Sequence, residues 1–148
     1  MISPEMLRRY PSFKEASDET LKVLAMNTDE LIFDAGDALF REDQAALHLY
    51  IVTHGEVDIQ YVLNTDERRT VDTRVPGDLL LWSAVVKPFR TTASAVARSM
   101  TKVLAIDATT LRGLCEQDRD LDRCLMREIA LVLSQRLQGA RVQLATVG

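Results

Sequence analysis

The chain has 148 residues, which is enough for one domain that buries roughly two-thirds of its unfolded surface. Its net charge of -4 argues against a domain that binds nucleic acid directly, because neutralisation of phosphates supplies most of that affinity. The sequence opens without a signal peptide, and no apolar run approaches the ~20 residues that span a bilayer. We therefore expect a soluble, cytoplasmic protein that does not enter a membrane.

The first part of the chain, residues 1–27, is predicted to be helical. Ser3 is a good N-cap, and Pro4 suits the first position of a helix. Pro11 ends that segment, and Ser17 begins a second helix.

Residues 28–106 have the pattern of short β-strands. Gly55 is interpreted as the corner of a hairpin between two alternating segments, 47–52 and 57–63, and the polar run 64–69 as a hairpin tip. Further strands are predicted at 31–33, 39–40, 71–75, 91–97 and 102–106. Many short strands separated by turn signals favour an antiparallel barrel or jelly roll.

The helical period returns in residues 107–145. Asp107 caps a short helix, and a long helix over 121–144 carries a broad apolar stripe. A helix of this length on a small barrel cannot bury the whole stripe against one partner. We therefore expect a homodimer that forms through the helix 121–144.

Two neighbouring segments carry the most information about function. Residues 76–83 read Pro-Gly-Asp-Leu-Leu-Leu-Trp-Ser, a tight turn followed by a short apolar run with the only tryptophan of the chain. Residues 88–93 read Pro-Phe-Arg-Thr-Thr-Ala, a basic and hydroxyl-rich loop that enters a strand of small residues.

In this order, these segments resemble the cyclic nucleotide-binding domain of the catabolite-activator-type (Crp/Fnr) regulators, over about residues 10–144. The resemblance is carried by 33–42, 49–57, 76–78, 90–93 and 125–137. It implies a single mainly β domain over 1–148, a jelly roll of eight strands with N-terminal helices and a long C-terminal dimerisation helix. It also implies a non-enzymatic regulatory domain whose partner is a small-molecule effector, either cAMP, cGMP or another small anion, with no required cofactor and no metal.

The family's cassette runs Gly-Asp, two apolar residues, then Gly-Glu, and the Glu accepts the ribose 2′-hydroxyl. Alignment on Gly77 and Asp78 puts Leu81 at the second Gly position, Trp82 at the Glu position and Ser83 next. An indole has only an N–H donor and cannot accept that hydroxyl. Alternatively, Gly77 and Asp78 are themselves the Gly-Glu pair, which lengthens the loop that follows.

The family's phosphate-binding arginine is also displaced in this sequence. Counting back from the end of the last strand puts Thr91 at the arginine position, with Arg90 one residue early. A one-residue slip turns a side chain to the opposite face of a strand, although a bulge before Thr91 would return Arg90 to the pocket. The candidate ligand-binding residues are Leu81, Trp82, Ser83, Arg90, Thr91 and Thr92.

High-affinity binding of cAMP in the usual manner is therefore disfavoured. Trp82 either fills the space of the ribose as a pocket wall or stacks on a planar ligand. His48 and His54 are interpreted as surface residues, and Cys115 and Cys124 as reduced thiols. No nucleophile–base–acid set or phosphate-binding Gly-rich loop supports catalysis.

Transcription factors of this family continue past the long helix into a winged helix-turn-helix, whereas this sequence stops at residue 148 and has no element that could read a major groove. Either a stand-alone sensor or a piece of a longer regulator fits that pattern. The rival hypothesis is a degenerate domain that binds no nucleotide and serves as a protein-interaction or dimerisation scaffold.

Overall fold

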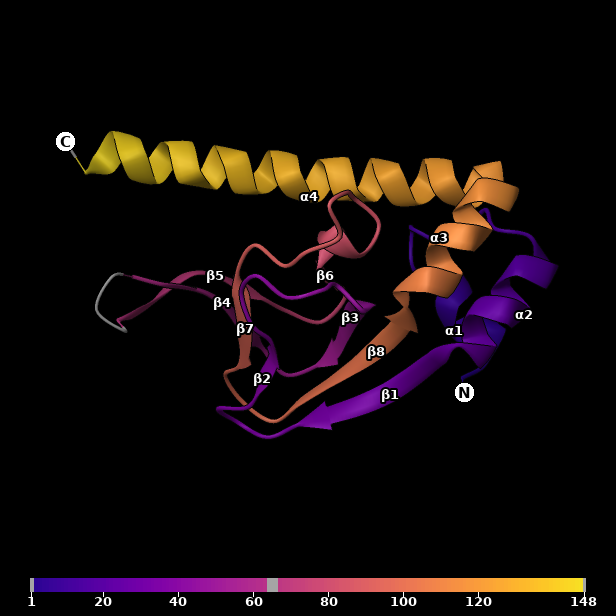
Figure 1. Cartoon of the computed structure of the whole chain (residues 1–148), viewed down its shortest axis with the longest axis horizontal. Helices are drawn as coiled ribbons and strands as arrows, with labels where there is room; N and C mark the ends of the chain where they lie inside the picture. The colour runs from indigo at the N-terminus through magenta and orange to yellow at the C-terminus, as the bar shows by residue number, and fades with distance from the viewer. Residues whose placement is uncertain (1, 64–66, 148) are drawn as a thin grey trace.

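The computed structural model describes residues 2–63 and 67–147, which form two four-stranded antiparallel sheets flanked by helices (Figure 1). The helices are α1 (Pro4–Arg8), α2 (Asp18–Met26), the short 3₁₀ helix η1 (Trp82–Ala84), α3 (Ala108–Gln117) and α4 (Arg119–Thr146). The strands are β1 (Thr28–Phe33), β2 (Ala38–Phe40), β3 (His48–His54), β4 (Val57–Val62), β5 (Arg68–Arg74), β6 (Leu79–Leu80), β7 (Ser94–Ala97) and β8 (Thr101–Asp107). The mainly β jelly-roll class with flanking helices is confirmed.

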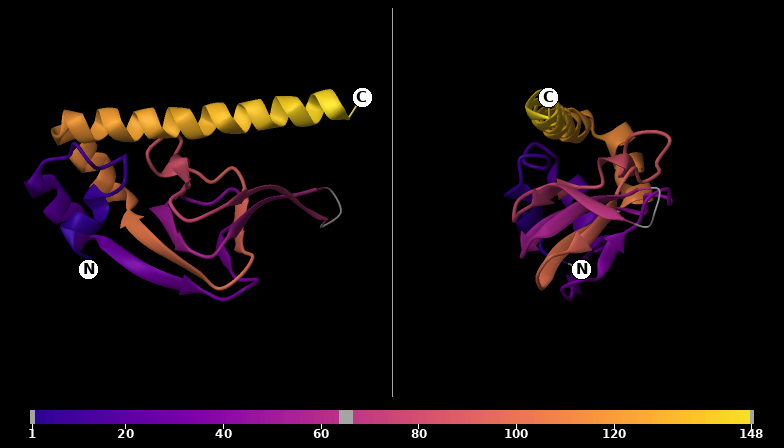
Figure 2. Two further views of the ribbon diagram at one scale, coloured as in Figure 1. Left: turned by 180° about the vertical axis from the view of Figure 1, so that it is seen from behind. Right: turned by 90° about the vertical axis from the view of Figure 1, so that its left-hand side faces the viewer.

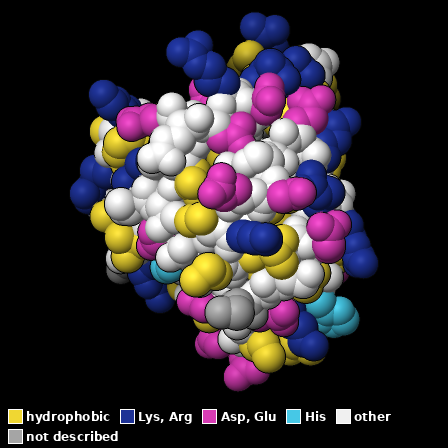
Figure 3. Space-filling view, turned by 90° about the vertical axis from the view of Figure 1, so that its right-hand side faces the viewer, with side chains coloured by type: hydrophobic (Ala, Val, Ile, Leu, Met, Phe, Trp, Pro, Cys, Tyr) yellow, Lys and Arg dark blue, Asp and Glu magenta, His cyan; other side chains and the backbone are white. Residues whose placement is uncertain are grey.

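Side-chain caps start the N-terminal helices where the sequence predicted. The Ser3 hydroxyl accepts a hydrogen bond from the Glu5 amide, and the Ser17 hydroxyl accepts one from the Thr20 amide at 3.1 Å. The two helices are also joined by an ion pair between Arg8 and Asp18. They lie beside α3 at one end of the molecule, where basic and acidic side chains alternate on the surface (Figures 1 and 3).

Strands that follow each other in the chain mostly alternate between the two sheets. One sheet has the order β1-β8-β3-β6 and the other β2-β7-β4-β5. Among the described residues, β4 and β5 are the only consecutive strands that pair with each other. Residues 64–66 of the predicted hairpin tip lie outside the described residues, and β5 already begins at Arg68.

The predicted hairpin at Gly55 is wrong. β3 pairs with β6 and β8, whereas β4 pairs with β5 and β7, so the turn carries the chain from one sheet to the other. Gly55 has φ 84°, and an added Cβ would lie 2.3 Å from the Met100 carbonyl oxygen. A local pattern reveals such a turn, but it does not reveal which sheet each flanking strand joins.

β3 is buried on both faces, unlike the alternation of a half-exposed strand. Leu49, Tyr50, Ile51 and Val52 are all buried. Tyr50 stacks on Phe40 of the opposite sheet, with ring centroids 5.9 Å apart, and therefore faces the inside of the roll. Leu49 and Ile51, the neighbours of Tyr50 in the strand, point to the opposite face of the sheet and are buried as well.

α4 begins at Arg119, two residues earlier than predicted, because Asp118 caps it. One carboxylate oxygen of Asp118 accepts from the Leu121 amide at 3.1 Å, and the other accepts from the Ser17 amide at 3.1 Å. One face of the helix is buried as far as Ile129, and the helix then runs along the roll in the direction of the β4–β5 hairpin (Figures 1 and 2). No helix among the described residues is long and apolar enough to cross a membrane.

Candidate functional site

The segment after the turn at Gly77 has the backbone shape of a ligand cradle. Leu81 follows β6 with φ 67°, in the left-handed region, and immediately precedes η1. A residue with a side chain rarely adopts this conformation, whereas a glycine does so without strain. Leu81, which the alignment puts at the family's second glycine, therefore has a backbone conformation that favours glycine.

The cradle itself is almost filled by its own side chains. Leu81, Trp82, Ser83 and Thr92 line a cavity of about 20 Å³. This volume has room for about one water molecule. A nucleotide-sized ligand does not fit between these residues as they stand, because pockets for such ligands measure ~300 Å³ or more.

The loop before β7 does not bring Arg90 or Thr91 to this cavity. The Arg90 side chain is half exposed, and its Nε lies 3.0 Å from Oδ1 of Asp43. Thr91 is buried, where its hydroxyl accepts from the Gln44 amide at 2.9 Å and donates to the Arg41 carbonyl. Thr91, at the family's arginine position, thus fastens one loop to another. Of the six candidates, the structure gathers Leu81, Trp82, Ser83 and Thr92.

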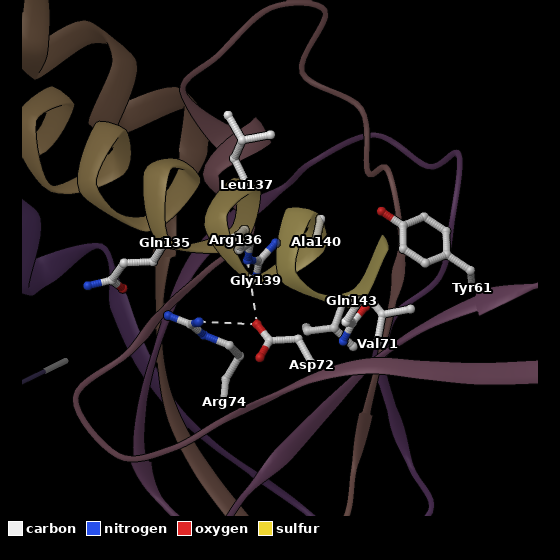
Figure 4. Close-up of a pocket in the computed structure, with 11 residues that line it drawn as sticks. Tyr61, Val71, Asp72, Arg74, Gln135, Arg136, Leu137, Gly139, Ala140 and Gln143 are labelled. Carbon is white, nitrogen blue, oxygen red and sulfur yellow. Dashed lines mark hydrogen bonds and ion pairs between the residues drawn. The ribbon is translucent and has the colours of Figure 1, made fainter. Parts of the chain in front are cut away.

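A much larger cavity lies beside the cradle, between the β4–β5 pair and α4 (Figure 4). Its volume is about 580 Å³, and it shares Ile59 and Arg136 with the small one. The roll contributes Ile59, Tyr61, Val71, Asp72 and Arg74. The helix contributes Gln135, Arg136, Leu137, Gly139, Ala140 and Gln143. An occupant would contact the sheet and the helix together.

Two arginines and one aspartate are the charged residues that line this cavity. Oδ2 of Asp72 lies 3.2 Å from Nη1 of Arg74 and 3.7 Å from Nε of Arg136 (Figure 4). The Arg74 side chain is only 11% exposed and also lies 3.4 Å from a carboxylate oxygen of Asp78. Burial lowers the pKa of Arg136, and the nearby Arg74 lowers it further.

The hydrogen-bonding capacity of the two arginines is largely unused. Among the described residues, three buried side-chain polar atoms lack a hydrogen-bond partner: Nε of Arg74, Nε of Arg136 and Oε1 of Gln60. The ion-pair distances of 3.4 and 3.7 Å bring charges together without forming hydrogen bonds at these nitrogens. Buried polar groups are nearly always paired, so the two unpaired guanidinium nitrogens make this cavity a candidate site.

Neither arginine was identified from the sequence, although a signal for each exists. Arg136 lies on the stripe that continues from Ile129 through Val132, so it is a charged residue on the inward face of a helix. At the end of β5 the usual burial is reversed, because Arg74 is buried while Val71 in the strand and Val75 just after it are exposed. Inward charges on two elements far apart in the chain indicate a shared polar site.

The chain belongs to the cyclic nucleotide-binding domain family, whose model matches residues 30–118. A protein from Geobacter metallireducens, described as a cyclic nucleotide-binding protein, has 34% sequence identity to this chain and a TM-score of 0.81, with 93% of this chain and 99% of that one covered. The Thermus thermophilus catabolite activator protein shares the fold, with 23% identity, a TM-score of 0.69, and 93% and 62% of the two chains covered. The resemblance to Crp/Fnr-type regulators is thereby confirmed.

Among curated proteins, the human cyclic nucleotide-gated channel beta-3 is 24% identical over 142 residues. The match covers 94% of this chain but only 17% of the channel. The chain therefore corresponds to one domain's length within that much longer relative.

Proposed function

We propose that this chain is a non-enzymatic regulatory domain that senses a nucleotide-like or other small anionic effector, in the cytoplasm and as a homodimer. The family supports a regulatory role, because its members include transcriptional regulators and a channel domain. The effector is proposed to occupy the cavity beneath α4. A role in transcription regulation stays a prediction.

The position of the large cavity is the observation that carries this proposal. One wall belongs to β4 and β5 and the other to α4, so a ligand contacts both elements. A ligand shifts a conformational equilibrium by its difference in affinity for the two states. A ligand that contacts the sheet and the helix gains or loses contacts when the helix moves, and therefore changes the helix position that is favoured.

The exposed surface of α4 supports the proposed dimer. Beyond Ile129, the helix keeps several large apolar side chains in solvent: Leu131, Leu133, Leu137, Val142 and Leu144. Leucines that recur at helical spacing on an exposed face favour packing against another helix. The partner that we propose is the same helix of a second copy.

Binding of cAMP and cGMP is the direct test. Trp82 is the only tryptophan of the chain and lies at the cradle beside the cavity, so its fluorescence reports on binding there. We expect one of these nucleotides to change the fluorescence and raise the melting temperature at sub-millimolar concentration. If both leave the protein unchanged at millimolar levels, cyclic-nucleotide sensing is rejected.

A second test concerns the dimer. Removal of the residues after Leu133 takes away Leu137, Val142 and Leu144, which are three of the five exposed apolar side chains named above. Light scattering should then report a monomer, and a dimer of the shortened chain would rule out assembly through this part of the helix.

The rival function is a scaffold that binds no nucleotide. The observation in its favour is the cradle of about 20 Å³, which Leu81 and Trp82 fill themselves. This hypothesis predicts a dimer with no response to any metabolite in a broad screen.

A further inference from the structure

The cavity beneath α4 concentrates positive charge at one point. Arg74 comes from β5 and Arg136 from α4, and both reach the carboxylate of Asp72 (Figure 4). Asp78 approaches only Arg74, at 3.4 Å. Within the described part of the chain, the ion pair of Arg136 is with this carboxylate of Asp72, 3.7 Å away, which it shares with a second arginine.

The donors of the two guanidinium groups are mostly free of protein partners. Each guanidinium has about five N–H donors in a planar fork. Among the described residues, Arg74 donates one side-chain hydrogen bond, to Asp72 at 3.2 Å, and Arg136 donates none. The other N–H donors of the two guanidinium groups have no protein partner among these residues.

Other arginines that contact the roll differ in this respect. Arg112 donates to the carbonyl oxygens of Ala84 at 2.6 Å and Ala46 at 3.2 Å, and its guanidinium lies 3.8 Å from the centre of the Phe89 ring. Arg90 is paired with Asp43 at the surface. The guanidinium groups of Arg112 and Arg90 thus bind other groups of the protein, whereas Arg74 and Arg136 line the cavity and have N–H donors without a protein partner among the described residues.

We infer that Arg74 and Arg136 form an oxyanion-binding site that receives a phosphate or carboxylate group of the effector in competition with the Asp72 carboxylate. The inference rests on the placement of the effector beneath α4 in the proposed function. Paired arginines suit such groups, because their planar forks match two oxygens of one oxyanion. The apolar part of the effector would lie against Val71, Leu137 and Ala140.

The site also gives the anion a way to act on α4. Arg136 is held to the sheet through Asp72, with no hydrogen bond of its own among the described residues. An oxyanion that bonds to both arginines replaces this weak link with a direct bridge between β5 and α4. The helix should then be held more firmly against the roll.

The experiment uses the full chain at constant ionic strength. Pyrophosphate is the phosphate probe, and citrate is the carboxylate probe. Affinity is measured by calorimetry for wild type, Arg136→Gln, Arg136→Lys and the control Arg141→Gln. Arg141 lies on the same helix, is exposed and does not line the cavity, so its replacement removes the same charge elsewhere. Light scattering of each variant shows whether the oligomeric state is unchanged.

We expect pyrophosphate to bind wild type and Arg141→Gln equally and Arg136→Gln about 10- to 100-fold more weakly, with a partial loss for Arg136→Lys. Tighter binding of citrate than of pyrophosphate would assign the site to a carboxylate. The inference is overturned if neither anion binds wild type, or if Arg136→Gln and Arg141→Gln bind alike. Nucleotide binding that does not depend on Arg136 would leave the proposed function standing and overturn the inference. Anion binding that depends on Arg136, without a response to cAMP or cGMP, would support the inference and reject only cyclic nucleotides as the effector.

Discussion

Arg136 of α4 lies 3.7 Å from the carboxylate of Asp72 in β5 and does not form a hydrogen bond with it. Among the described residues, this is the only ion pair between α4 and either sheet. The contact is long and shared with Arg74, so it holds the helix weakly. A helix that is held weakly at this point can respond to what enters the cavity.

Replacement of Asp72 by Asn should strengthen anion binding. The change removes a like charge at the point where an oxyanion would bind, which is worth on the order of fivefold in affinity at a solvated site. Pyrophosphate titration of Asp72→Asn by calorimetry provides the measurement. If Asp72 served only to position the arginines, the variant would bind the anion more weakly than wild type.

The assignments of Arg90 and Arg136 make opposite predictions. The sequence comparison puts Thr91 at the family's arginine position and leaves the phosphate to Arg90 only if a bulge precedes Thr91; the structure pairs Arg90 with Asp43 at the surface. We expect Arg90→Gln to keep pyrophosphate affinity within about twofold, since the ion pair that it breaks is exposed and weak. A tenfold loss in Arg90→Gln with no loss in Arg136→Gln would assign the phosphate to Arg90.

The same substitution at two glycines should change stability in opposite directions. Gly55→Ala puts a methyl group 2.3 Å from the Met100 carbonyl oxygen at a positive φ, so we expect a loss of more than ~2 kcal/mol in the free energy of unfolding. Gly113 lies within α3 with nothing near its added Cβ, and Gly113→Ala should add about 0.5–1 kcal/mol. Urea denaturation measures the free energy of unfolding of both variants. Equal effects would contradict the close contact between the Gly55 turn and Met100.

The stability supplied by Asp107 should depend on pH. Its carboxylate accepts hydrogen bonds from the Thr110 amide and hydroxyl, both at 2.9 Å. The hydrogen bond from the amide holds the pKa of Asp107 below its ordinary value of 3.8. A depressed folded pKa adds stability above about pH 4, and this stability is lost as the pH falls through the folded value. Asp107→Ala should therefore cost about 0.5–2 kcal/mol at neutral pH and less near pH 3.

Asp107→Asn is the matched control, because asparagine still caps a helix but carries no charge. Its stability relative to Asp107→Ala should not change over the same pH range. A gap between wild type and Asp107→Ala that stays constant down to pH 3 would contradict the depressed pKa.

Cys115 should react slowly with iodoacetamide in the folded protein. Burial, together with the carboxylates of Asp122 and Asp118, raises the pKa of its thiol to about 12. The reactive thiolate is then on the order of a thousandfold rarer at pH 8 than for an ordinary thiol of pKa 9. Mass spectrometry of the labelled peptide, with the urea-unfolded chain as reference, measures the rate. Labelling as fast as in the unfolded chain would contradict this environment.

Much of the fold could be predicted from the sequence because strand and helix periods are local properties. The caps Ser3, Ser17 and Asp107 were placed correctly for this reason. Pairing between strands is not local, so the turn at Gly55 was misread as a hairpin. The same limit applies to the site, because Arg74 and Arg136 meet only when α4 lies across the roll.

One carboxylate, that of Asp118, both begins α4 and holds the start of α2 through the Ser17 amide. The two helices therefore share a pivot at the end of the molecule opposite to the C-terminus (Figure 1). We expect a tilt of α4 about this point to shift the start of α2, because the hydrogen bond between Ser17 and Asp118 joins the two. An effector bound near the middle of the long helix would in this way change the surface at both ends of the domain, so a partner protein could detect the bound state without contacting the roll.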